Sequence, residues 1–238
     1  MPQYYIEPQY CVAETFTLTG PEAEHAVRVM RIVPGAEITL FDGMGKKWRA
    51  RVAETGRGEL SGQIIEELPA PVARLRADLY FAPVSKAAVS ELLDCCTQLG
   101  AHSFTPVLAA RCEHKIADRF ETKSESWRKT LIASCKQCGR ADIPAVSAPV
   151  PFGQAVLSVG KGVIGLLTGN AVPLVDGIKR LELSAGESVA VFVGPEGGFT
   201  PDEEAAALRA GLVPVSLGVH TLRAETACIA ACAVLCAA

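Results

Sequence analysis

The sequence lacks several features that would assign it to a broad class at once. No stretch approaches the roughly eighteen uninterrupted apolar residues of a membrane-spanning helix. The first residues, MPQYYIEPQY, do not have the basic and then apolar layout of a secretory signal, so we expect a cytoplasmic protein. Basic residues are not in excess either, because the net charge is −3. Contacts with RNA, if any, must therefore come from local patches.

Cysteine is abundant, but its pattern does not indicate a disulfide framework. The nine cysteines are an odd number, and the chain is neither short nor recognisably secreted. Cys228, Cys232 and Cys236 recur every four residues in an alanine-rich stretch, as small buried hydrophobic residues do. Cys135 and Cys138 have the spacing of a metal or redox pair, but a zinc site needs further ligands at suitable spacing. We therefore expect structural cysteines and no bound metal.

What is present indicates two domains. The 238 residues are 49% hydrophobic, enough for a substantial core. Residues 1–70 contain short β-like runs, among them EITLFDG with an Asp-Gly turn signal, and the alternating run KKWRARVAE. One helix, TGPEAEHAVRVMRI, is predicted to start with a capping box between Thr19 and Glu22. These elements predict a small β-rich domain, followed by the proline-containing linker LPAPVARLR.

Residues 75–238 alternate strand and helix patterns, which predicts an α/β domain with a parallel sheet and crossover helices. Two predicted helices, over residues 86–99 and 120–138, are closed by Gly100 and Gly139. The runs DLYFAP, SFTPVL, GVIGLLTG, SVAVFVG and LVPVSLG are predicted to be buried strands.

The segment FVGPEGGFTPDE joins a predicted strand to a helix with a capping box at Thr200 and Glu203. Ligands bind at such strand ends in open α/β sheets. The loop has neither the Gly-Lys-Ser/Thr of a phosphate-binding loop nor the glycine spacing of a dinucleotide fingerprint. Glu196 in its centre would also repel a phosphate. We expect a neutral or cationic ligand that approaches the glycine backbone; a tight turn without a ligand is the alternative.

A second glycine-containing loop, SLGVHTLRAETA, follows the next predicted strand. Together, VGPEGGFTPDE and SLGVHTLRAETA resemble the C-terminal signature of the RsmE family, SPOUT-superfamily methyltransferases that make 3-methyluridine in 16S rRNA using S-adenosylmethionine. QLGAHSFTPVLAARC, SCKQCGR and HAVRVMRIVPGAEITLFDGMG resemble further family segments. The resemblance covers most of the chain.

The resemblance implies a PUA-like β-barrel RNA-binding domain over residues 1–70 and a SPOUT domain with a C-terminal trefoil knot over residues 75–238. It implies S-adenosylmethionine as the cofactor, S-adenosylhomocysteine as its product, and a homodimer that acts on 16S rRNA in the small ribosomal subunit. The implied cofactor-binding residues are Leu167, Thr168, Gly169, Gly194, Pro195, Glu196, Gly197, Gly198, Leu217, Gly218, Leu222 and Thr226.

The implied catalytic residues are Arg223 and Glu225. Uridine N3 carries a proton in the neutral base, so methylation requires a proton acceptor or a cation that stabilises the N3 anion. Arg223 suits the second role because a guanidinium stays charged. Glu225 and Glu196 are candidates to offset the positive sulfonium or to shape the loops.

RNA docking is assigned to eight basic residues, of which the first six fall in the N-terminal domain around Trp48. They are Arg28, Arg31, Lys46, Lys47, Arg49, Arg51, Arg111 and Arg140. Solvated surface cations are the alternative for each. Three residues depart from the family pattern: Cys95, Gln98 and His220. The alternative functions are methylation of another RNA target, RNA binding without catalysis, and, least favoured, a cysteine-based metal or redox protein.

Overall fold

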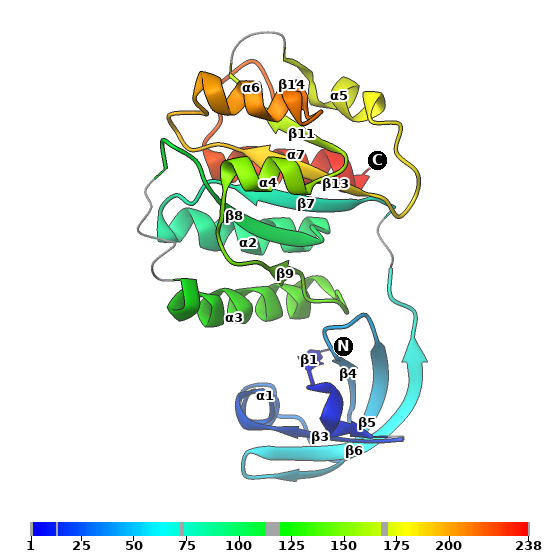
Figure 1. Cartoon of the computed structure of the whole chain (residues 1–238). Helices are drawn as coiled ribbons and strands as arrows, with labels where there is room; N and C mark the ends of the chain where they lie inside the picture. Colours follow the sequence, from blue (N-terminus) through cyan, green and yellow to red (C-terminus); the bar gives the residue numbers. More distant parts are fainter. Residues whose placement is uncertain (1, 13, 72–73, 113–119, 168–170, 238) are drawn as a thin grey trace. The chain divides into compact units, whose positions relative to one another are not determined.

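The computed structural model describes residues 2–12, 14–71, 74–112, 120–167 and 171–237 (Figure 1). The chain divides into two compact units, Met1–Val72 with Ile132–Ile143, and Ala73–Leu131 with Pro144–Ala238. The second segment of the first unit contains the end of a long helix whose beginning belongs to the second unit. Among the helices in the described part of the chain, none has the length and hydropathy needed to cross a bilayer.

The first unit is built on a six-stranded mixed sheet with the order β1-β4-β5-β6-β3-β2. Its strands are β1 (Gln3–Tyr5), β2 (Cys11–Val12), β3 (Thr15–Thr19), β4 (Glu37–Phe41), β5 (Lys47–Gly56) and β6 (Glu59–Leu68). β1 pairs with β4 in parallel, and the other neighbours are antiparallel. The alternation in β5 is confirmed, because Ala50 and Val52 are buried in the core while Arg51 is exposed.

The predicted hairpin after EITLFDG joins β4 to β5. Asp42 stabilises its loop, because Oδ1 accepts hydrogen bonds from the backbone N–H groups of Met44 (2.7 Å) and Lys46 (3.0 Å). The strand signals from Glu37 onward are thus confirmed, and the strands β1, β2 and β3 are additions.

The capping box predicted at Thr19 is wrong. Thr19 lies at the N-cap of α1 (Gly20–Glu24) but makes no side-chain cap hydrogen bond. Gly20 turns the chain sharply with φ of 63°, and the Glu22 carboxylate accepts a hydrogen bond from Lys136 Nζ at 2.8 Å. The helix continues as a π-helical turn over His25–Val29, and a short 3₁₀ turn, Pro8–Tyr10, precedes β2.

The second unit is a parallel sheet with the order β10-β8-β7-β13-β11-β14-β12, and β9 pairs with β8. Its strands are β7 (Arg76–Phe81), β8 (Ser103–Leu108), β9 (Ala145–Val146), β10 (Val150–Pro151), β11 (Gly162–Gly165), β12 (Val172–Pro173), β13 (Ser188–Val193) and β14 (Val213–Ser216). Its helices are α2 (Lys86–Leu99), the first part of α3 (Phe120–Cys138), α4 (Phe152–Ser158), α5 (Leu174–Arg180), α6 (Pro201–Arg209) and α7 (Ala224–Ala237).

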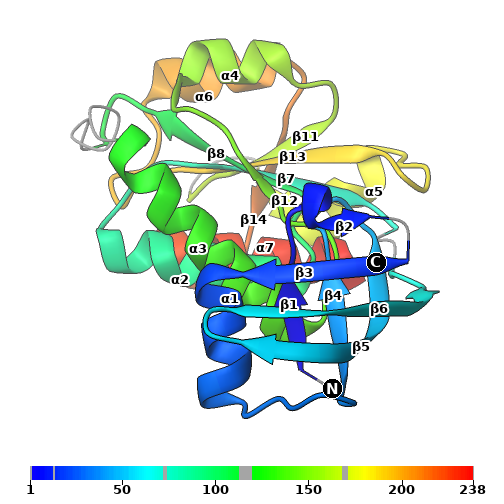
Figure 2. The ribbon, with the colours of Figure 1, turned by 90° about the horizontal axis from the view of Figure 1, so that it is seen from below.

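Helices cover both faces of this sheet, with α4 and α6 on one side and α2 and α7 on the other (Figure 2). The central strand β13 is therefore buried along nearly its whole length, as expected of a strand covered on both faces. The predicted helices over 86–99 and 120–138 are confirmed, and Gly100 and Gly139 follow them with φ of 104° and 82°. The predicted class, a parallel α/β domain preceded by a small β-rich domain, is confirmed.

Candidate functional site

Three neighbouring strands of the second unit end beside one another. β11 lies between β13 and β14 and pairs with both in parallel, so their carboxyl ends meet at one edge of the sheet. Each strand leads into a loop, namely Leu166 and Leu167 after β11, residues 194–200 after β13 and residues 217–223 after β14. This is where open α/β sheets bind ligands.

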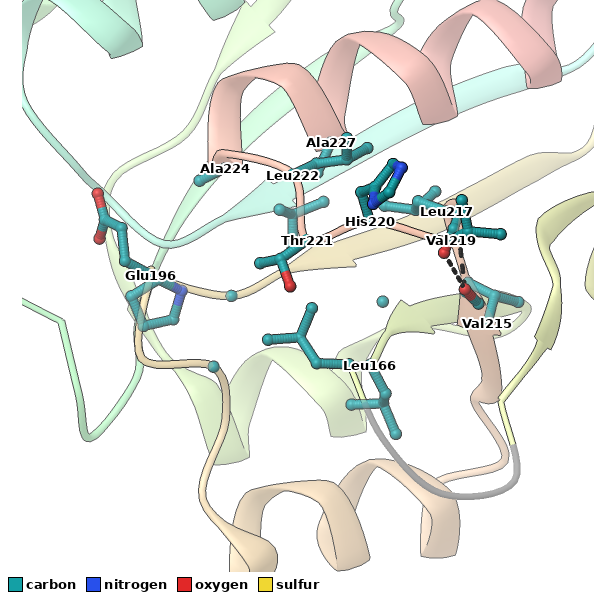
Figure 3. Close-up of a pocket in the computed structure, with 18 residues that line it drawn as sticks. Leu166, Glu196, Val215, Leu217, Val219, His220, Thr221, Leu222, Ala224 and Ala227 are labelled. Carbon is teal, nitrogen blue, oxygen red and sulfur yellow. Dashed lines mark hydrogen bonds between the residues drawn. The ribbon is translucent and has the colours of Figure 1, made fainter.

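These loops enclose a pocket of about 140 Å³ (Figure 3). Its lining combines backbone and apolar side chains with four polar side chains, those of Glu196, Ser216, His220 and Thr221. The lining residues are Gly165, Leu166, Leu167, Val193, Gly194, Pro195, Glu196, Gly198, Val215, Ser216, Leu217, Gly218, Val219, His220, Thr221, Leu222, Ala224 and Ala227.

The loop after β13 is a tight turn in which the N–H of Gly198 donates to the carbonyl of Pro195 at 2.8 Å. At Gly194, a Cβ would lie 3.1 Å from the Phe199 ring, so this position favours glycine because of close packing within the protein. Phe199 is buried, with its ring centroid 4.8 Å from that of Phe152. The buried phenylalanine therefore fixes the end of the loop in the core.

The start of α6 carries the predicted capping box. The N–H of Glu203 donates to Thr200 Oγ1 at 3.3 Å, and the N–H of Thr200 donates to Glu203 Oε2 at 2.8 Å. The other carboxylate oxygen of Glu203 accepts from the N–H of Ala110, in the loop after β8, at 2.7 Å. The cap thus links two loops at the carboxyl edge of the sheet.

The loop after β14 is shaped by Ser216, whose hydroxyl donates to the carbonyl of Gly218 at 2.9 Å. Gly218 has φ of 151°, which favours glycine. The Thr221 hydroxyl points into the pocket towards Leu166, whereas the Glu196 carboxylate points away from both (Figure 3). Glu196 makes no hydrogen bond to the described loop backbone, which leaves the carboxylate open to another partner.

Eight of the twelve predicted cofactor residues line this pocket: Leu167, Gly194, Pro195, Glu196, Gly198, Leu217, Gly218 and Leu222. Gly197 does not line it, and its carbonyl accepts a hydrogen bond from Arg111. Thr226, exposed on α7, does not line it either. Thr168 and Gly169 lie outside the described residues.

The predicted catalytic residues lie beside the pocket rather than in its lining. Arg223 is exposed and stands between the lining residues Leu222 and Ala224. Its carbonyl accepts from the N–H of Ala227 at 2.8 Å, so it caps the first turn of α7. Glu225 is half-buried in that turn.

Several lining residues were not among the named cofactor residues, including Leu166, Val193, Val215 and Thr221, although Val193 and Thr221 fall within the two quoted loop motifs. Most of them flank a predicted loop residue directly. In the sequence, only their position beside a motif could have indicated them, and that position does not show whether a side chain points into the pocket.

The basic residues predicted on β5 are occupied by partners within the first unit. Arg51 Nη2 lies 2.8 Å from Glu37 Oε1, and Arg49 Nη2 lies 2.8 Å from Glu66 Oε1. The pKa of Glu37 is lowered by its hydrogen bond with Arg51 and, to a lesser degree, by the charge of Arg49. Lys47 Nζ donates to the carbonyl of Gly139 at 2.9 Å.

Arg28, Arg31 and Lys46 are exposed, and Arg28 and Arg31 are close in sequence around the end of the π-helical turn. Arg31 has φ of 53°, a left-handed conformation that costs energy for a non-glycine residue. Beside them, Val29 and Met30 are exposed as well. This surface offers cations and apolar contacts together.

Arg140 has a different environment. Its side chain is only 14% exposed, and its Nε donates to Asp142 Oδ1 at 3.0 Å. Nearby, the Cys135 Sγ donates to the carbonyl of Asp142, and burial raises the pKa of this thiol to about 12. A thiol so reluctant to ionise is a poor metal ligand or redox group.

All nine cysteines lie within the described residues, and each is a thiol rather than half of a disulfide. Cys228 and Cys232 are buried on α7, as the four-residue spacing predicted, and Cys236 is half-buried. The described part of the chain contains no group of three or more histidine, cysteine or acidic side chains placed to hold a metal ion.

Comparisons with known proteins agree with this architecture. A family model described as an RNA methyltransferase domain matches residues 71–236, and one described as an RNA methyltransferase PUA domain matches residues 18–65. Ribosomal RNA small subunit methyltransferase E of Synechocystis sp. is 33% identical over 232 residues, which are 93% of this chain and 73% of that protein. The Bacillus subtilis protein of the same name is 30% identical, over 95% of this chain and 93% of its own.

A crystal structure of ribosomal RNA small subunit methyltransferase E from Neisseria gonorrhoeae, bound to S-adenosyl methionine, superposes with a TM-score of 0.86. It is 30% identical and covers 98% of this chain and 96% of its own. The family models, the relatives and this structure together span both units, and they confirm the resemblance seen in the glycine-loop motifs. The chain belongs to the RsmE family of ribosomal RNA small subunit methyltransferases.

Proposed function

We propose that this protein methylates N3 of one uridine in the decoding region of 16S rRNA, with S-adenosylmethionine as the methyl donor and S-adenosylhomocysteine as the product. The observation that carries the proposal is the pocket formed by three loops at adjacent strand ends, in a chain of this family. The relatives are named for small-subunit rRNA, and the N. gonorrhoeae structure holds the donor.

The pocket suits this cofactor chemically. At Gly198 and Gly218, whose φ angles are 66° and 151°, a Cβ would meet no protein atom within 4 Å, so a ligand has access to the backbone. Leu166, Leu167 and Leu222 offer apolar surface for an adenosine. Glu196, whose carboxylate points outward at the rim, adds a negative charge near the pocket that favours a cation and disfavours a phosphate.

When bound, S-adenosylmethionine supplies a methyl group activated by a sulfonium. The residues of this chain must then deal with the proton on uridine N3. We assign Arg223 to stabilise the N3 anion, because it is exposed beside the pocket wall and remains charged. Glu225, in the first turn of α7, would offset the positive charge of the sulfonium, and Glu196 would do so once its carboxylate turns towards the pocket.

We assign residues 1–70 to RNA binding as a PUA-like domain and residues 75–238 to catalysis, with a trefoil knot formed by the loops around the pocket. We further propose a homodimer in the cytoplasm. The exposed apolar side chains at the pocket, Val219 (95% exposed) and Leu167 (63%), support a second copy covering this rim.

The decisive experiment gives the purified protein labelled S-adenosylmethionine and unmodified small ribosomal subunits, then maps the modified nucleotide by mass spectrometry. We expect one 3-methyluridine in 16S rRNA. Arg223→Ala should nearly abolish transfer while binding of the donor persists. A methyl group found on another base or on a ribose would show that the proposed target is wrong. Failure of the protein to bind S-adenosylmethionine would favour RNA binding without catalysis.

A further inference from the structure

Arg111, in the loop after β8, makes contacts that its predicted role in RNA binding does not explain. Its Nη1 donates to the carbonyl of Gly197 at 2.6 Å and to the carbonyl of Phe199 at 3.2 Å. Both acceptors belong to the loop after β13, one wall of the pocket. A single guanidinium nitrogen thus holds two carbonyls of that loop.

The aliphatic part of the same side chain lies against Gly197. A Cβ at Gly197 would come 3.4 Å from Arg111 Cδ and 3.6 Å from Arg111 Cβ. Gly197, the first glycine of the pair, therefore packs against the arginine at a distance where a Cβ would make only ordinary van der Waals contact. Gly197 does not line the pocket itself, so its contact with Arg111 lies on the outer side of the loop.

The rest of the loop shows why such a contact matters. Pro195 and Phe199 are buried and fix its two ends, whereas Glu196 and Gly197 between them are exposed. Within this stretch the turn is closed by one backbone hydrogen bond, from Gly198 to Pro195. The exposed middle of the loop is held from outside by Arg111.

We propose that Arg111 is a positioning residue of the cofactor pocket, which fixes the loop after β13 in the geometry that binds the donor. This proposal rests on the proposed function, because it takes the pocket to be the cofactor site. Arg111 acts through the carbonyls of Gly197 and Phe199 before any RNA arrives. The neighbouring hydrogen bond from Ala110 to Glu203 holds the two loops together next to it.

The first test needs no ligand. Hydrogen–deuterium exchange of the full-length protein should show faster exchange over residues 194–200 in Arg111→Ala than in the wild type. Arg111→Lys retains a cationic donor and should recover part of the protection. Arg209→Ala is the matched control, because Arg209 is an exposed arginine at the far end of α6. Equal protection of this loop in Arg111→Ala and the wild type would overturn the proposal.

The second test measures S-adenosylmethionine binding by calorimetry without RNA. Loss of a charged hydrogen-bond donor should weaken binding by Arg111→Ala about tenfold, with Arg209→Ala unchanged. If Arg111→Ala raises only the KM for ribosomal subunits and leaves the donor affinity unchanged, Arg111 contacts RNA and the positioning role is overturned. A wild type that binds no donor would count against the cofactor site itself, and the exchange data would still report on the contact between Arg111 and the loop.

Discussion

The thiol of Cys135 shows how strongly surroundings determine chemistry at the level of one residue. Cys135 is fully buried, and burial raises the pKa of its thiol to about 12. We predict that iodoacetamide near neutral pH labels the exposed Cys138 in the native protein and leaves Cys135 unmodified, since the thiolate is the reactive form. Peptide mass spectrometry after brief labelling measures both sites.

Protein unfolded in urea is the control, and there both thiols should react. Labelling of native Cys135 as fast as Cys138 would contradict the burial. The raised pKa of Cys135 also makes the stability of the fold depend on pH. The folded chain keeps this proton up to about pH 12, whereas an unperturbed thiol loses it near 9.0. The contribution of Cys135 to folding is therefore complete below that lower value and is lost as the pH rises between the two.

At this scale, the sequence predicted which faces are buried better than it predicted which charges are satisfied. The alternation of β5 placed Arg51 outside, as observed, but its ion pair with Glu37 depends on the register that sets Arg51 opposite Glu37 on β4. Cross-strand neighbours of this kind are far apart in sequence. A run of basic residues on a strand therefore overstates the positive charge available to RNA.

Helix caps can be compared at the level of elements. The N-cap of α6 is a reciprocal box between Thr200 and Glu203, whereas Ser85 at the N-cap of α2 accepts one hydrogen bond, from Ala88, at 3.3 Å. We predict that Thr200→Ala lowers the free energy of unfolding by about 1 kcal/mol. Ser85→Ala, which removes the weaker cap, should cost less. Urea denaturation of both variants measures the difference, and equal losses would show that the box adds nothing.

Helix ends were predictable where their signals are local. Gly100 and Gly139 close α2 and α3 with positive φ, and no distant residue is needed for that. The box at Thr19 does not form, and the Glu22 carboxylate that would complete it pairs with a distant side chain, Lys136. The pocket followed the same rule: its loops were visible as motifs, but their meeting depends on the order β13-β11-β14.

For the whole molecule, RNA binding must work against a net charge of −3. In the first unit, Arg49 and Arg51 are paired with acidic side chains and Lys47 with a carbonyl. Arg28, Arg31 and Lys46 are exposed and have no such partner among the described residues, so they are left as the predicted contacts with RNA. The left-handed backbone at Arg31 adds weight, because strain is usually retained where function needs it. Recognition should then rest on a few phosphate contacts rather than on a broad basic field.

This leads to a prediction for the variant Arg28→Gln with Arg31→Gly. Glycine suits the φ of 53° at position 31, so the change removes a cation without adding strain. We expect a higher KM for small ribosomal subunits, with kcat and donor affinity unchanged, because the pocket lies in the other unit. Each lost phosphate contact should reduce the slope of log affinity for RNA against log salt concentration by about one. Arg57→Ala, at another exposed cation of the first unit, is the matched control. If Arg57→Ala changes KM and the salt slope as much as the double variant does, the loss of any surface cation has this effect, and the surface around Arg31 does not dock RNA.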